Sequence, residues 1–74
     1  METKITEALR KAREIARVES VRNGVTMREI DNKVHEIARE YKLSTGEEDW
    51  AKQEALASYI ISCEVLQVIP KSGY

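Results

Sequence analysis

The sequence predicts an all-α protein, a small three-helix bundle built from a helical hairpin and a longer C-terminal helix. Three stretches repeat apolar residues at intervals of three and four positions, which is the spacing of one helix face. The two stretches between them carry residues that end one helix and begin the next. The chain has 74 residues with no internal repeat or linker, so we expect a single domain over 1–74.

The first helix is expected over about 3–22. Its apolar side combines three large aliphatic residues with several alanines, which would let a neighbouring helix approach closely; these residues are Ile5, Ala8, Leu9, Ala12, Ile15 and Ala16. Asn23 and Gly24 follow, and glycine after a helix end adopts the left-handed conformation without a Cβ clash. We therefore expect the first helix to end there and the chain to turn back.

The second helix is expected over about 27–42. Thr26 and Glu29 have the spacing of a capping box, and Val25 and Ile30 have the spacing of a hydrophobic staple. Behind this start, the apolar residues recur with nearly ideal helical periodicity. The first two helices should therefore form an antiparallel hairpin.

The third helix is expected over about 46–69, with Thr45 and Glu48 as a second capping box and Pro70 forbidding continuation. Residues 70–74 are expected to be a short mobile tail. Residues 62–69 are rich in β-branched side chains, so a short strand is the alternative for this segment. A strand needs a partner, and no second run of this kind occurs, which favours the helix.

This last helix has two apolar stripes instead of one. With about 100° per residue, Ala57, Ile61, Val65 and Val68 lie near Trp50, and Leu56, Tyr59, Cys63 and Leu66 lie on the opposite side. A helix that is apolar nearly all round must be covered on several sides. We expect the Trp50 stripe to face the core and the Leu56–Leu66 stripe to form an interaction surface. The alternative is a central helix covered entirely within one chain.

Charge is high but balanced, with a net charge of −1. Residues 1–22 carry six basic and four acidic side chains, whereas residues 44–69 carry one basic and five acidic ones. Arg10, Arg13 and Arg17 lie together on the first helix and could contact an anionic partner such as nucleic acid. General nucleic-acid binders are usually strongly basic, so this interpretation is the alternative and not the main one.

No pattern commits the chain to a reaction, and we expect no catalytic residue, cofactor or metal ion. Cys63 is the single cysteine and stands in an apolar run, which favours a buried free thiol in a reducing compartment. His35 is the single histidine and has no companion at metal-ligand spacing. The sequence also lacks the glycine-rich loops that cradle phosphates.

The beginning of the chain, 1–11, is charged at close intervals and has no apolar core of a signal peptide. The longest uncharged run, 55–63, is far shorter than the roughly 20 residues that span a bilayer. We therefore expect a cytoplasmic protein that does not enter membranes.

Residues 12–16, 23–26 and 29–31 (AREIA, NGVT and EID) resemble the helical hairpin that opens the methionine-aminopeptidase type of fold. The resemblance covers under half of the chain. In that family the metal ligands lie far downstream, in a domain of several hundred residues. The resemblance therefore implies a helical hairpin here and no activity.

We expect a small non-catalytic interaction module that acts as a regulator, inhibitor or accessory protein, of a kind common in phages and bacteria. It would work as a homo-oligomer or through a protein partner bound on the last helix. A nucleic-acid-associated regulator is one alternative. A small-ligand binder or mutase-like helical enzyme assembled across a dimer is the second.

Overall fold

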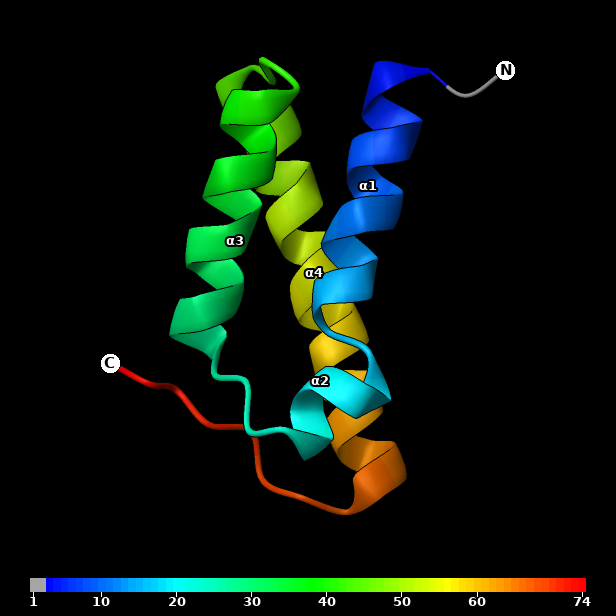
Figure 1. The fold of residues 1–74 in the computed structure, drawn as a ribbon, viewed down its shortest axis with the longest axis vertical. Coiled ribbons are helices and arrows are strands. Elements are labelled where there is room, and N and C mark those ends of the chain that lie inside the picture. Colours follow the sequence, from blue (N-terminus) through cyan, green and yellow to red (C-terminus); the bar gives the residue numbers. More distant parts are fainter. Residues whose placement is uncertain (1–2) are drawn as a thin grey trace.

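A computed structural model describes residues 3–74 of the chain. All regular elements in this range are helices: α1 (Lys4–Ile15), α2 (Val18–Arg22), α3 (Met27–Glu40) and α4 (Thr45–Leu66). Figure 1 shows the three long helices running side by side, with the short α2 below α1 and beside the lower half of α4. The predicted all-helical class is confirmed; residues 1 and 2 of the predicted domain lie outside the described residues.

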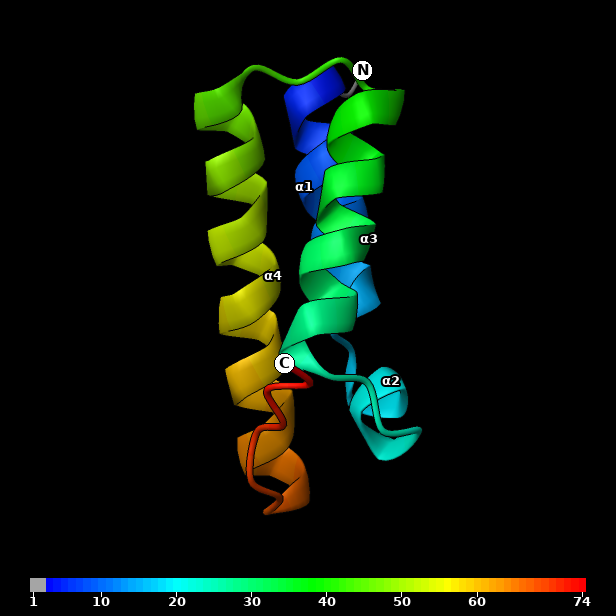
Figure 2. The same ribbon diagram turned by 90° about the vertical axis from the view of Figure 1, so that its left-hand side faces the viewer.

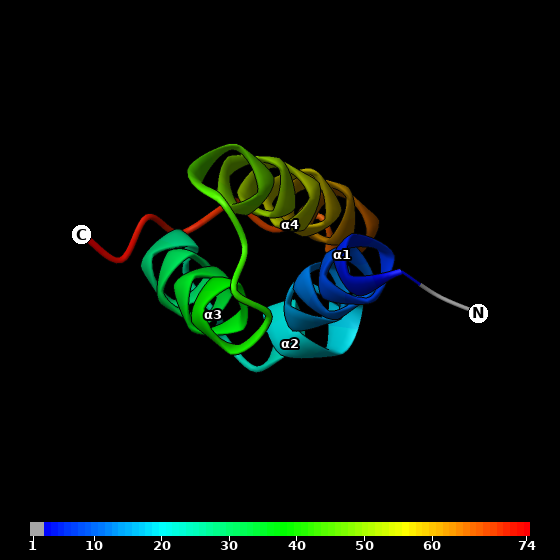
Figure 3. The same cartoon turned by 90° about the horizontal axis from the view of Figure 1, so that it is seen from above.

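Alanines form the contact between α1 and α4. Ala8, Ala12 and Ala16 from one side, with Ala51 and Ala55 from the other, are fully buried. Side chains this small let two helix backbones approach closely, so little space is left between them. Viewed from above, α3 lies across both helices and closes the triangle (Figure 3). It contributes the largest fully buried aliphatic side chains, Ile30 and Val34.

The first helix does not continue to residue 22 as expected; it breaks at Ala16 and Arg17. Neither residue is a helix breaker, so we attribute the break to contacts with α4. From α4, Ser62 Oγ donates a hydrogen bond of 2.7 Å to the carbonyl of Ala16, and Ser58 Oγ donates one of 3.2 Å to that of Arg13. These donors satisfy carbonyls that a continuous helix would have used. The break lets α2 turn across the lower end of the bundle.

The start of α3 follows the prediction, because the Thr26 hydroxyl accepts a hydrogen bond from Glu29 N–H. The cap of α4 lies one residue earlier than expected, at Ser44 with Glu47 in place of Thr45 with Glu48. Both bonds of this capping box form, at 2.8 and 3.2 Å. The Ser44 amide and hydroxyl hold the pKa of the Glu47 carboxyl below its ordinary value.

Two helices end on left-handed residues that are not glycine. Lys42 has φ 53° just after α3, and Gln67 has φ 56° after α4. These ends come two or three residues before the predicted ones at 42 and 69. The segment 62–66 is helical, so the strand alternative is wrong for it.

Residues 71–74 are not a free tail, contrary to expectation. The Lys71 carbonyl accepts from Met27 N–H at 2.8 Å, and the Ser72 carbonyl accepts from Arg28 N–H at 3.0 Å. Two amides at the start of α3 that have no partner within the helix are thereby satisfied. Figure 2 shows this segment (red) returning from the end of α4 to the lower end of α3. The Tyr74 hydroxyl also donates a hydrogen bond to Asp31.

We predict that Gly73→Ala destabilises the fold by about 1–3 kcal/mol. Gly73 has φ 79°, and an added Cβ would clash with the Thr26 side chain. Gly46→Ala is the matched control, because a Cβ there meets nothing within 4 Å and the position lies in the first turn of α4. Thermal unfolding followed by circular dichroism should show a lower Tm only for the Gly73 variant. Equal Tm values for the two variants would contradict the capping role of the C-terminal segment.

Candidate functional site

The structure reverses the two predicted faces of α4. Tyr59 and Cys63, expected on an interaction surface, are only 1% and 2% exposed and belong to the core. Leu56 and Leu66 are half-buried and pack against that core. The expected interaction surface Leu56, Tyr59, Cys63 and Leu66 is thus the inner face of α4. The physical reason is the burial of Ala51 and Ala55, because these alanines lie on the same side of the helix as Tyr59 and Cys63, which leaves Trp50 on the outside.

The outer face of α4 is therefore the candidate functional site. Its residues are Trp50, Ala57, Ile60, Ile61 and Val65, which we call the α4 face. Trp50 is 51% exposed, Ile61 61% and Val65 65%. The solvent sides of α1 and α3 instead carry charged residues, as surface helices usually do.

The α4 face is large for a chain of this size. At roughly 150–250 Å² for a large, fully exposed side chain, its five residues expose on the order of 500 Å². The largest apolar patch of a typical monomer covers about 300–600 Å² and is often functional. The estimated area of the α4 face lies within this range. With about 100° per residue, Gln53, Glu54 and Glu64 lie between the apolar residues of the face, and Gln53 and Glu64 are exposed.

The three arginines of α1 do not form a free cationic patch. Arg13 lies 3.6 Å from Glu54 of α4, and Arg10 and Arg17 lie 3.6 and 3.2 Å from Glu14. All these groups are partly exposed, so each pair stabilises the fold only slightly. The pairing lowers the net positive potential that a nucleic acid would meet. The geometry therefore does not favour Arg10, Arg13 and Arg17 as phosphate contacts.

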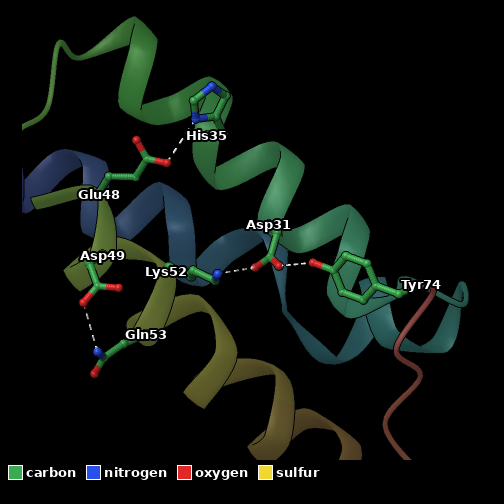
Figure 4. A network of polar contacts seen from close by, with 7 residues as sticks. All are labelled: Asp31, His35, Glu48, Asp49, Lys52, Gln53 and Tyr74. Carbon is green, nitrogen blue, oxygen red and sulfur yellow. Dashed lines mark hydrogen bonds and ion pairs between the residues drawn. The ribbon is translucent and has the colours of Figure 1, made fainter. Parts of the chain in front are cut away.

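A polar network connects α3 to the first half of α4 (Figure 4). His35 Nδ1 lies 3.0 Å from Glu48, and Lys52 lies 3.7 Å from Asp31, which also accepts the Tyr74 hydroxyl bond. The bond to Asp31 raises the pKa of the Tyr74 hydroxyl above its usual value. Within residues 3–74, no three potential ligands cluster to hold a metal ion. The network joins two helices and the C-terminal segment.

A pocket of about 280 Å³ opens at the lower end of the bundle, between α2, α4 and the C-terminal segment. Tyr59 forms its inner wall. The Tyr59 hydroxyl accepts from Lys71 N–H at 2.8 Å, and its proton points to the carbonyls of Val25 at 3.2 Å and Lys71 at 3.4 Å. Burial raises the pKa of this hydroxyl above its usual value of 10. The sequence prediction missed the pocket, since the C-terminal segment was not expected to fold back.

No helix among the described residues is long and apolar enough to cross a membrane. In the comparisons with known proteins, no family model, no curated protein and no solved structure matches the chain.

Thiol labelling tests which face of α4 lies inside. We predict that Cys63 reacts with an aromatic disulfide reagent at least about a hundredfold more slowly in the native protein than in denaturant, because reaction requires local opening. In a Cys63→Ala background, Ile61→Cys should react at nearly the denatured rate when the protein is diluted until it is monomeric, because Ile61 is 61% exposed in the single chain. Rapid labelling of native Cys63 would show that the inner face has been assigned wrongly.

The Tyr59 hydroxyl gives a pH-dependent prediction. Tyr59→Phe should reduce the free energy of unfolding by about 1–3 kcal/mol near neutral pH, since partly buried backbone groups of Val25 and Lys71 lose a hydrogen-bond partner. Because the folded-state pKa is raised, this stabilisation is complete below pH 10 and is lost as pH rises through the higher folded value. Urea unfolding of both proteins at neutral and strongly alkaline pH should show the difference shrinking. A difference that stays constant would contradict the burial of this hydroxyl.

Proposed function

We propose that the protein is a small, non-catalytic interaction module that self-associates through the α4 face. One observation carries this proposal: Trp50, Ile61 and Val65, three large apolar side chains on one helix face, are each more than half exposed. Exposed apolar surface of this extent is stabilised when a partner covers it. A second copy of the chain is a partner that is always present with it.

The distribution of residues along α4 suits an antiparallel pair. Suppose that two copies cross near Ala57. Position 50 lies seven residues before the crossing, and positions 64 and 65 lie seven and eight residues after it, so position 50 of each helix lies opposite positions 64 and 65 of its partner. Each Trp50 would then cover Val65 and the nearby Ile61 of the other copy. Ala57 at the crossing has a side chain small enough for close approach.

Charge also favours the antiparallel direction. Glu47, Glu48 and Asp49 cluster at the start of α4, and a parallel pair would bring the two acidic ends together. An antiparallel pair separates them by nearly the length of the 22-residue helix. Each face would bury on the order of 500 Å² from the apolar residues, and Gln53 and Glu64, which lie among them, would bring the area toward the roughly 800 Å² per partner of a standard interface.

We predict that the wild-type protein sediments at twice its 8.5 kDa chain mass at micromolar concentration. Ile61→Asp should weaken association at least about a hundredfold, because each interface would bury two unpaired carboxylates. Asn32→Asp is the matched control: it adds the same charge at an exposed position of α3. Sedimentation equilibrium over a concentration series would measure the association of the wild-type protein and of both variants.

Two results would overturn this proposal. One is a wild-type protein that stays monomeric at all concentrations. The other is equal weakening by Ile61→Asp and Asn32→Asp, which would show that net charge and not the α4 face governs association. Circular dichroism should show unchanged helix content for both variants, because both positions are exposed.

A further inference from the structure

We propose that the pocket at the lower end of the bundle binds a small aliphatic carboxylate of about eight carbons. This site shares no residue with the α4 face, so it does not depend on self-association. Its residues come from three separate parts of the chain: α2 and the turn after it, the second half of α4, and the C-terminal segment.

The walls of the pocket are apolar. Val21 and Tyr59 are buried, and Leu66 is half-buried, so the inner part is lined by fixed side chains. Val68 and Ile69 also line the pocket, and their side chains are 47% and 86% exposed. An occupant with a hydrocarbon body would cover these exposed side chains, which the described chain leaves in contact with solvent.

The charge of the pocket is of one sign. Two of its lining residues are ionised at neutral pH, Arg22 and Lys71, and none is acidic. Within residues 3–74, neither the Arg22 guanidinium nor the Lys71 ammonium forms an ion pair. A carboxylate at the opening would give both cations a partner and could accept charge-assisted hydrogen bonds. The combination of apolar walls and two unpaired cations selects an amphipathic anion.

The size of the pocket limits the hydrocarbon body. At the roughly 30 Å³ that each non-hydrogen atom occupies in liquid water, a volume of about 280 Å³ holds about nine such atoms. Octanoate has a matching size. The Tyr59 hydroxyl is already engaged with the backbone of Val25 and Lys71, so it offers no further donor. The polar end of the ligand should therefore lie toward the cations and its tail toward Tyr59 and Leu66.

Titration of the full chain with sodium octanoate, followed by ¹H–¹⁵N NMR, tests this site. We expect a Kd on the order of 1 mM or below, with the largest shifts at the amides of Gly24, Val25 and Val68. Octan-1-ol has the same tail without the charge and should bind about tenfold more weakly. No saturable shift at these amides, or equal affinity for acid and alcohol, would overturn the proposal.

Charge variants complete the test. Arg22→Gln combined with Lys71→Gln should weaken octanoate binding about tenfold and leave the affinity for octan-1-ol unchanged, which shows that the pocket is intact. The matched control removes two exposed cations of α3, Lys33→Gln with Arg39→Gln, and should leave both affinities unchanged. Equal loss of octanoate affinity in the control would overturn the proposal, because binding would then follow net charge.

A single variant guards against damage to the C-terminal segment. Arg22→Gln lies outside that segment and should by itself weaken octanoate binding about threefold. This is half of the free-energy change expected for the double variant. The same measurements in the Ile61→Asp background should give the same affinities. Loss of octanoate binding in that background would show that the pocket depends on the α4 face. Self-association itself is tested by sedimentation and not by octanoate binding.

Discussion

The fold depends on how closely α1 and α4 approach each other. The chain of α1 and its C-cap bury three alanines completely, and α4 buries two, so a larger residue at any of these positions would overpack the core. This contact fixes the rotation of α4 about its own axis. Tyr59 and Cys63 then point between the helices, and Trp50, Ile61 and Val65 point away from them. The surface available to a partner is thus a consequence of where the alanines lie.

Hydrogen bonds from distant residues close the lower end of the bundle. Serines of α4 satisfy the carbonyls at the end of α1, and carbonyls of the C-terminal segment satisfy the amides at the start of α3. Tyr59 joins these regions, because its hydroxyl contacts the backbone on both sides of the pocket. The walls of the pocket are therefore held by hydrogen bonds of the partly buried Tyr59 hydroxyl.

Helix class and the start of α3 could be predicted from the sequence, because periodicity and the Thr26 cap are local signals. The break after Ile15 could not, since its cause is two serine hydroxyls more than forty residues away. The two stripes of α4 were recognised, but the wrong one was placed inside. Hydrophobicity favours burying Trp50, whereas steric fit favours burying Ala51 and Ala55, and helical periodicity does not weigh one against the other. The pocket was beyond prediction because it requires the C-terminal segment to return.

The position of Trp50 has a consequence for spectroscopy. It is the single tryptophan, and it lies half-exposed on the outer side of α4 instead of in the core. Its indole is already in contact with water in the folded chain, so its emission changes little when an isolated chain unfolds. The intrinsic fluorescence of this protein therefore reports what covers α4, and circular dichroism is the better measure of its folding.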